Sequence, residues 1–163
     1  MGMTALCADH VEQVLGPYRL LKATPDQICQ HWLFIRDSLM MQMPIGVKPS
    51  ELVLANIQQA LLAGRLHCWF LLNVDNNSVL GVCTTTVTED TISGVRNLLI
   101  YSVLAMDPIP TKVWAYCYKV MQVFAKGAGC QHVIACTRNK RVLRLVKMLG
   151  GSEDNRFIEL EVT

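Results

Sequence analysis

Histidine and cysteine side chains lie close together at two places in the sequence. His132 is flanked by Cys130 and Cys136, and these are residue types that bind zinc. On an extended strand, however, residues 130 and 136 are separated by about 20 Å at ~3.3 Å per residue, which excludes a shared ion. His67 and Cys68 are adjacent, and adjacent strand residues point to opposite faces, so they do not form a base and nucleophile. The sequence predicts no metal site.

Two carboxylates, Glu89 and Asp107, follow segments with the pattern of strands. A carboxylate acts as a general base when it lies within hydrogen-bond distance of the proton that it removes. Both residues also have an ordinary explanation as solvated turn residues, and Asp107 precedes Pro108 as a turn opener does. They are the candidates for proton transfer, although the turn interpretation is the stronger one for each.

Basic residues surround the last predicted helix, at positions 138–147. They could contact a phosphate or a nucleic acid, but the apolar residues between them form a stripe, which is typical of an amphipathic helix with a solvated outer face. The net charge of +2 indicates no strong preference for nucleic acid. We therefore expect no nucleic-acid partner. The basic residues are Arg138, Lys140, Arg141, Arg144 and Lys147.

The chain is organised around a helix, a strand and a helix at residues 111–150. Apolar residues recur at helical spacing in residues 113–124 and 142–149. The short apolar run at residues 132–137 between them predicts a buried strand. Two helices that flank a buried strand need a sheet to cover, so the other strands must supply it.

Capping signals mark two further helices. Thr24, Pro25 and Gln27 match a helix start with a capping box, and the apolar stripe continues to residue 39, before a methionine-rich segment. Ser50 is the expected N-cap of the next helix, which ends at Gly64.

Alternating and apolar runs predict strands at residues 18–22, 67–74, 79–88, 96–106 and 157–162. Residues 75–77 are a turn signal, so 67–74 and 79–88 form a hairpin. Alternation places Leu80 and Val82 on one face of the strand and Val79 and Cys83 on the other.

The composition is that of one apolar domain. The chain has 163 residues, of which 52% are hydrophobic and only 17% are charged, against about 25% charged residues in an average protein. Such a chain can cover part of its surface with another subunit. Seven cysteines without a CxxC pair predict buried small hydrophobes in a reducing compartment. No signal peptide or membrane span is expected, so the predicted location is cytoplasmic.

This order of elements resembles the GCN5-related N-acetyltransferase (GNAT) fold, a mixed central sheet flanked by helices, over residues 1–163. Residues 139–150 are similar to the family run Asn-x-x-Ala-x-x-x-Tyr-x-x-x-Gly, and residues 125–130 to its Ala-x-x-x-Gly-Cys helix end. The resemblance implies that Asn139 contacts the pantetheine arm of acetyl-CoA. It also implies that the backbone near Leu104 and Ala105 receives the thioester carbonyl.

Two positions depart from the family pattern. Family members carry a glycine-rich loop whose backbone N–H groups approach the pyrophosphate of acetyl-CoA, whereas this chain has residues 109–114, Ile-Pro-Thr-Lys-Val-Trp. Pro110 lacks an N–H group, and Lys112 and Trp114 occupy the places of the glycines. Val146 replaces the tyrosine that protonates the leaving thiolate in many members.

These departures leave two hypotheses for the function. The first is a non-catalytic GNAT-like protein without a cofactor, which binds other protein subunits as an assembly component. Proteins of this kind occur in bacteriophage particles and accessory sets. The alternative is an acyl-CoA-dependent N-acetyltransferase in which Thr111 and Lys112 replace the glycine N–H groups at the phosphates. The sequence by itself favours the first hypothesis.

Overall fold

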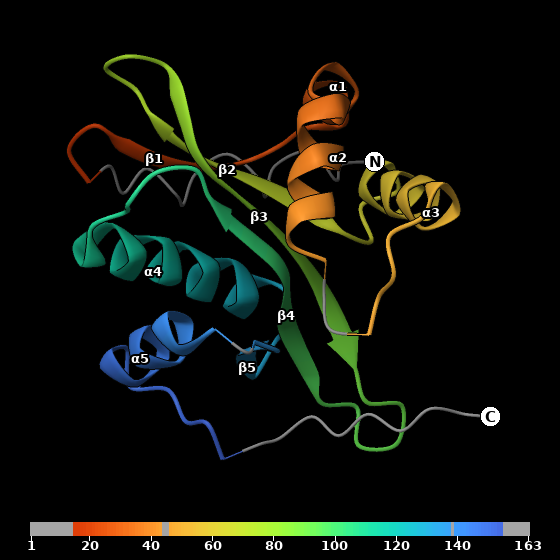
Figure 1. Cartoon of the computed structure of the whole chain (residues 1–163). Helices are drawn as coiled ribbons and strands as arrows, with labels where there is room; N and C mark the ends of the chain where they lie inside the picture. The colour runs from red at the N-terminus through yellow and green to blue at the C-terminus, as the bar shows by residue number, and fades with distance from the viewer. Residues whose placement is uncertain (1–14, 44–45, 138, 155–163) are drawn as a thin grey trace, which may run out of the picture.

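The computed structural model describes residues 15–43, 46–137 and 139–154. Its helices and strands follow one another in the order that the sequence predicts (Figure 1). They are β1 (Tyr18–Lys22), α1 (Pro25–Gln30), α2 (Trp32–Met41), α3 (Glu51–Leu62), β2 (His67–Asn73), β3 (Ser78–Glu89), β4 (Arg96–Ala105), α4 (Thr111–Gly127), β5 (His132–Ala135) and α5 (Lys140–Met148).

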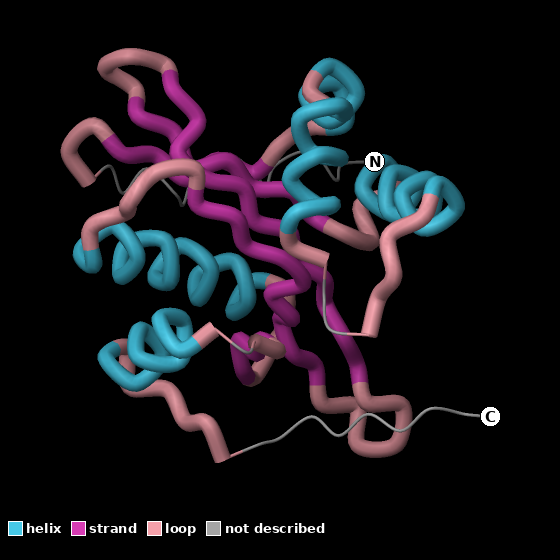
Figure 2. Tube along the Cα trace, viewed as in Figure 1, coloured by secondary structure: helices cyan, strands magenta, loops and turns pink. Residues whose placement is uncertain are grey.

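The strands form a five-stranded sheet in the order β1-β2-β3-β4-β5 (Figure 2). The pairs from β1 to β4 are antiparallel, and β5 lies parallel to β4. The predicted turn between β2 and β3 is confirmed, with Asn77 at a φ of 53°. This is the mixed α/β fold class that the sequence predicts.

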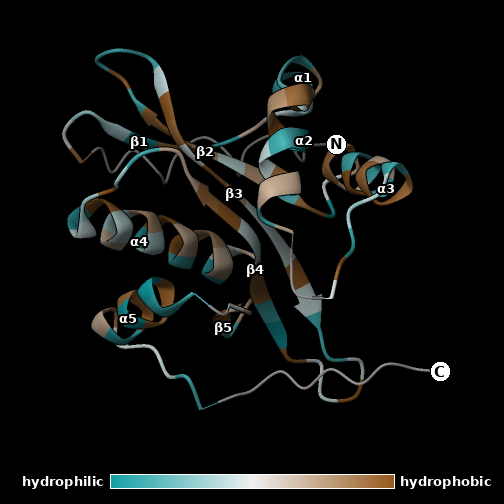
Figure 3. Cartoon of the chain, viewed as in Figure 1, coloured by the Kyte–Doolittle hydropathy of each residue, from teal (hydrophilic) through white to brown (hydrophobic). Residues whose placement is uncertain are grey.

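Helices cover both faces of the sheet. Alternate residues of β2 point to opposite faces, so Cys68 and Phe70 pack with α1, α2 and α3, whereas Trp69 and Leu71 pack with α4. In Figure 3 the hydrophobic colouring concentrates on the central strands and on α3, and the connecting loops are mostly hydrophilic. The two hydrophobic clusters hold the sheet between α1–α3 and α4.

Local signals set the helix starts as predicted. Thr24 and Gln27 form the capping box, and Ser50 accepts a hydrogen bond from the Val53 N–H group at 3.2 Å. The helix expected from residue 25 to residue 39 is divided at His31, although the N–H of His31 still bonds the Gln27 carbonyl at 2.9 Å. The stripe therefore stays aligned, and Ile28, Ile35 and Leu39 are buried on one side.

A bulge in β3 changes the faces predicted for its first residues. Leu71 pairs with Gly81 and Leu72 with Val79, which leaves Leu80 without a partner. Leu80 consequently joins Cys83 in the α4 cluster, and Val79 joins Val82 in the opposite cluster. The simple alternation predicted for this strand is wrong because a bulge reverses the direction of side chains on one side of it.

The strand expected at residues 132–137 is present but is not buried. β5 ends at Ala135 and pairs with β4, and of its four residues only Val133 is shielded from solvent, and then only partly. The prediction failed because this strand, which the sequence pattern places inside a sheet, is the last strand of the described sheet. The further strand expected at residues 157–162 lies outside the described residues.

The cysteines are not uniformly buried. Cys68 is buried, and Cys83, Cys117 and Cys130 are partly buried, but Cys29 and Cys136 are exposed. The prediction of buried cysteines is therefore wrong for these two, because both lie on outward-facing positions of their segments. No helix within the described ranges has the length and apolar character needed to cross a membrane.

Candidate functional site

The most distinctive irregularity of the sheet is a bulge in β4 at Tyr101. Thr84 pairs with Ser102 and Thr85 with Ile100, so Tyr101 is the extra residue on the β4 side. A bulge bends its strand and turns the residues after it in a new direction. The bend therefore separates β4 into a first half, Arg96–Ile100, and a second half after the bulge.

The second half of β4 has no described strand beside it on the β5 side. The pairing of β4 with β5 runs from Asn97 and His132 to Ile100 and Ala135, and β4 then continues alone to Ala105. We call the place where the two strands cease to pair, between residues 101–105 and the end of β5, the wedge. The main-chain groups of β4 there have no partner in a described strand on that side, and unpaired main-chain groups of a strand can bind an extended ligand.

The direction of the main chain shows which groups face the wedge. The carbonyl oxygen of Leu104 points to β3, since a Cβ atom added at Gly81 would lie 2.9 Å from it. Main-chain groups alternate in direction along a strand. The N–H and C=O groups of Val103 and Ala105 therefore point to the wedge, so of the two predicted backbone positions only Ala105 presents its amide there.

The start of α4 lies at the same end of β4. Pro110 is the N-cap residue, and its carbonyl accepts the N–H groups of Val113 at 2.9 Å and Trp114 at 3.2 Å. The N–H groups of Thr111 and Lys112 come before these two and have no partner within the helix. Proline at this position removes only its own donor, so two donors and the Lys112 ammonium group remain at the helix start.

Buried neighbours hold the loop before α4 against the sheet. Ile109 packs in the α4 cluster, and its Cδ1 atom would be 3.7 Å from a Cβ atom at Gly81. Val113 is fully buried in the same cluster and points away from solvent. Val113 therefore does not compete for space with an anion at the exposed residues Thr111 and Lys112.

Asn139 occupies the start of α5. Its Oδ1 atom accepts the N–H of Arg141 at 2.9 Å, and its own N–H donates to the Thr137 hydroxyl at 3.1 Å. The side chain is exposed, and its amide NH₂ group stays available as a donor. Contact of Asn139 with a pantetheine arm stays a prediction, with this NH₂ group as the part that could make it.

The two candidate bases lie at opposite ends of the β3–β4 ladder. Glu89 pairs with Arg96, and their side chains are 3.6 Å apart, whereas Asp107 follows the other end of β4. The length of β4 separates them by roughly 30 Å at ~3.4 Å per residue. Only Asp107, which is exposed, lies at the wedge end of the ladder.

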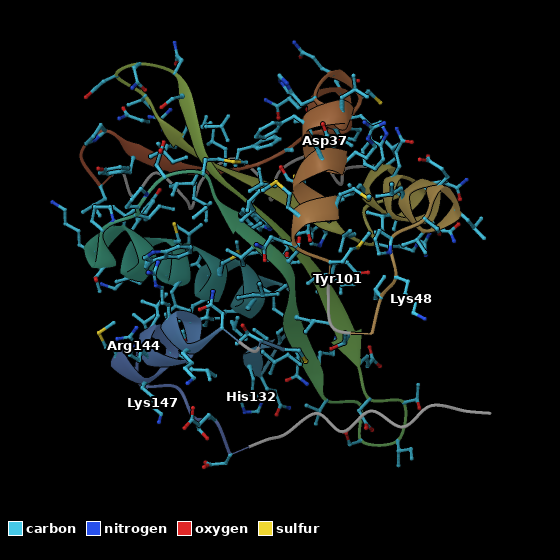
Figure 4. The ribbon with its side chains drawn as sticks, in the orientation of Figure 1. Asp37, Lys48, Tyr101, His132, Arg144 and Lys147 are labelled. Carbon is cyan, nitrogen blue, oxygen red and sulfur yellow. The ribbon has the colours of Figure 1, made fainter. Side chains whose placement is uncertain are left out.

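Tyr101 is a titratable residue that the sequence analysis missed. Its side chain is partly buried against the cluster below α1–α3, and this burial raises the pKa of Tyr101 above its ordinary value. The phenol therefore stays protonated near neutral pH and can donate a hydrogen bond. Figure 4 shows Tyr101 near the end of α2, whereas Arg144 and Lys147 project from α5 across the picture. In the sequence, Tyr101 is only one tyrosine inside an apolar strand, and such a pattern does not reveal a bulge.

Two of the remaining candidates, His132 and Lys147, have structural partners. His132 Nδ1 lies 3.1 Å from the Asn97 side-chain oxygen, and Lys147 forms a 2.6 Å ion pair with Glu153. Within the described ranges, the structure has no group of three possible metal ligands close enough to bind one ion. Lys140, Arg141, Arg144 and Lys147 are exposed, which agrees with the prediction that the basic residues of α5 lie on a solvated helix face.

Comparisons with known proteins identify the architecture. No family model and no curated protein sequence matches the chain. Among solved structures, a predicted acetyltransferase from Clostridium acetobutylicum, crystallised with acetyl-CoA, has a TM-score of 0.66 and 15% identity, over 88% of this chain and 96% of its own. An aminoglycoside 6′-N-acetyltransferase from Acinetobacter baumannii has a TM-score of 0.64 and 11% identity, over 90% and 98%.

A Trypanosoma brucei acetyltransferase extends the similarity to a third source, with a TM-score of 0.58 and 17% identity over 89% of this chain and 99% of its own. At these identities the comparison establishes the architecture of the chain. The chain thus has the GCN5-related N-acetyltransferase fold, a five-stranded sheet flanked by helices.

Proposed function

We propose that the chain is an acyl-CoA-dependent N-acyltransferase. The observation that carries the proposal is the wedge, because a strand that leaves its neighbour after a bulge presents main-chain groups to an extended ligand. The similar solved structures are acetyltransferases, and one of them was crystallised with acetyl-CoA. These findings favour the enzyme hypothesis over the non-catalytic one preferred from the sequence.

The residues at the wedge suit the parts of acetyl-CoA. The main-chain groups of Val103 and Ala105 would hold the pantetheine arm, with the NH₂ group of Asn139 as a further donor. The N–H groups of Thr111 and Lys112 and the Lys112 ammonium group would hold the diphosphate, since a helix start favours anions. Bound acetyl-CoA would supply the thioester that an amine attacks.

Proton transfer would depend on groups at the same end of β4. Asp107 is the carboxylate at this position, and Tyr101, the residue at the bulge, carries a phenol that can donate a proton. Val146 has no proton to give, and its carbonyl oxygen accepts the N–H of Gly151 at 2.9 Å. The thiolate that leaves would therefore take its proton from solvent or from a group other than residue 146.

Calorimetric titration with acetyl-CoA tests the proposal. We expect binding in the micromolar range, and a free ligand concentration of about 100 times Kd should stabilise the fold by about 2.7 kcal/mol. Lys112→Glu should weaken binding roughly fivefold, whereas Lys119→Glu, an exposed position farther along α4, should not. Absence of binding at millimolar acetyl-CoA would remove the enzyme proposal.

Turnover needs an assay that does not depend on free thiols. Cys29 and Cys136 are exposed and would react with a thiol reagent, so the acetylated amine should be measured by mass spectrometry. A panel of amines that includes an aminoglycoside and a peptide N-terminus gives the acceptor class. Replacing Asp107 with Asn should lower kcat by about 10²-fold or more if it is the base.

Exposed apolar residues on α2 and α3 support a second candidate function, binding to protein subunits. Leu33, Met41 and Leu52 are 65%, 71% and 72% exposed. Large exposed apolar side chains on neighbouring elements are typical of an interaction surface. Light scattering tests this hypothesis, and a monomer at every concentration, together with no captured partner, would count against it.

A further inference from the structure

A cavity of about 570 Å³ lies at the end of the sheet opposite to the wedge. It is bounded by the start of β2 and β4, the end of β3, the last turn of α4 and the connection from α3 to β2. In Figure 1 α4 runs toward β4, so its last turn ends beside this part of the sheet. The lining residues are Gly64, Arg65, His67, Thr86, Val87, Arg96, Phe124 and Ala128.

The charged groups of this cavity are mostly positive. Arg65 and Arg96 line it, and its eight lining residues include no carboxylate. Lys22 adds an ammonium group, which lies 5.0 Å from the centre of the Phe124 ring. Glu89 is the opposing charge, 3.6 Å from Arg96 and 58% exposed to solvent.

Helix ends could oppose an anion here, because α3 and α4 both terminate at the cavity and a helix C-terminus carries about half a negative charge. Their last carbonyl groups are largely occupied. The Ala60 carbonyl accepts the N–H groups of Arg65 and Leu66, and the Ala125 carbonyl accepts that of Cys130 at 2.8 Å. Three full positive charges, one carboxylate and two half charges leave about one positive charge in excess.

An aromatic wall completes the cavity. The rings of His67 and Phe124 meet edge to face, with their centres 5.0 Å apart. Burial, and then the positive charge of Lys22, lower the pKa of His67. The cavity thus combines cationic groups with an apolar surface, in a volume typical of small-molecule sites, about 300–1,000 Å³.

We propose that this cavity binds a small organic phosphate ester, with the phosphate held by the guanidinium groups of Arg65 and Arg96. Guanidinium groups pair with phosphate through two parallel hydrogen bonds. A phosphate monoester carries about 1.5 to 2 negative charges at neutral pH. This charge balances the two positive charges of Arg65 and Arg96 better than the single negative charge of a carboxylate ligand would. The organic part of the ligand packs against Phe124 and Val87.

Titration with phenyl phosphate, followed by the NMR signals of His67, tests this site. We expect phenyl phosphate to shift these signals and to raise the pKa of His67, because the negative charge of the anion counters the positive charge of Lys22. Phenol, the uncharged analogue, should leave both unchanged. No binding at about 10 mM phenyl phosphate, ten times a millimolar Kd, overturns the proposal.

Substitutions locate the site. The double variant R65Q/R96Q should bind phenyl phosphate at least about tenfold more weakly, because two charge-assisted contacts are lost. The single variant R65Q leaves the contact of Arg96 with Glu89 intact, and it should show part of this loss of affinity. It therefore tests the site even if the double variant does not fold. R36Q removes a guanidinium group from α2 and should bind normally. Equal affinity in wild type and R65Q overturns the proposal.

Dephospho-coenzyme A, which keeps the diphosphate and the pantetheine arm but lacks the 3′-phosphate monoester, distinguishes this cavity from the wedge. With saturating dephospho-coenzyme A present, phenyl phosphate should still bind with unchanged affinity, because the two places lie at opposite ends of β4. Competition between the two ligands would place the phosphate at the wedge and overturn the proposal. The acetyl-CoA titration tests the acyltransferase proposal separately, so failure of that proposal or of the phosphate-site proposal leaves the other one intact.

Discussion

Gly81 is the residue whose missing side chain permits the close approach of β3 and β4 next to the wedge. A Cβ atom there would lie 2.9 Å from the Leu104 carbonyl oxygen, which is backbone and cannot move independently. The same atom would contact Ile109, the residue that anchors the loop before α4. A single hydrogen atom in place of a methyl group thus sets the geometry of the candidate site.

Gly81→Ala should therefore destabilise the fold by about 1–3 kcal/mol, as overpacking does. Gly127→Ala is the matched control, since a Cβ atom at that position meets no atom within 4 Å. Urea denaturation followed by circular dichroism measures both. A Gly81→Ala variant as stable as the control would show that β3 and β4 can move apart without loss of stability.

His67 should make stability depend on pH. Its pKa in the folded chain is lowered below the ordinary value of 6.5, first by burial and then by Lys22. Between the two pKa values the unfolded state binds more protons, so the free energy of unfolding is highest above pH 6.5 and falls as the pH decreases through it. The substitution His67→Gln removes this titrating group and therefore its contribution to the pH dependence of stability.

Denaturation at several pH values between 5 and 8 measures this effect. The variant should lose part of the decrease seen in wild type, and Lys22→Gln should raise the pKa of His67 without restoring it fully, because burial remains. The same decrease in wild type and His67→Gln would assign the pH dependence to other groups.

At the scale of the elements, capping contacts determine where helices begin. Thr24 Oγ1 accepts the Gln27 N–H at 3.3 Å, and Gln27 Oε1 accepts the Thr24 N–H at 2.9 Å. Ile28, in the first turn after the box, is buried among the residues below α1–α3. The capping box therefore positions a core residue as well as a helix start.

Thr24→Ala should lower the free energy of unfolding by about 1 kcal/mol. Thr91→Ala, at an exposed position in the turn between β3 and β4, serves as the control and should change it little. Thermal unfolding of both variants gives the comparison. Equal melting temperatures would mean that α1 starts without help from the cap.

At the scale of the whole molecule, burial should decide which thiols react. Burial raises the pKa of Cys68 and Cys117 to about 12, and it also raises that of Cys83. Thiolates are the reactive form. Cys68 and Cys83 lie on strands of the packed sheet and Cys117 lies on α4, whereas Cys29 and Cys136 are exposed.

In a Cys7→Ser background, a thiol reagent should label Cys29 and Cys136 quickly. The remaining cysteines should react only as the chain unfolds, and mass spectrometry of peptides identifies each labelled position. Fast labelling of Cys68 in the native protein would show that β2 opens locally. Addition of acetyl-CoA, if it binds, should slow the labelling of buried positions further.

The sequence alone determined the features that depend on neighbours within about four residues. The capping box at Thr24, the cap at Ser50, the turn at Asn77 and the order of helices and strands follow from local hydrogen bonds and from periodicity. Those elements, in that order, were enough to predict the GNAT fold. Asn139 was predicted from its local run as a contact to the pantetheine arm, which stays a prediction, and the structure shows it as the N-cap residue of α5.

Only the tertiary structure decided how distant segments register with one another. The bulges at Leu80 and Tyr101, the wedge beside β5 and the exposure of β5 depend on which strands pair and where the pairing stops. The cavity likewise unites Arg65, Arg96 and Phe124, residues far apart in the chain. Local propensity carries no information about such pairings, because they are selected by the packing of two clusters on opposite faces of one sheet.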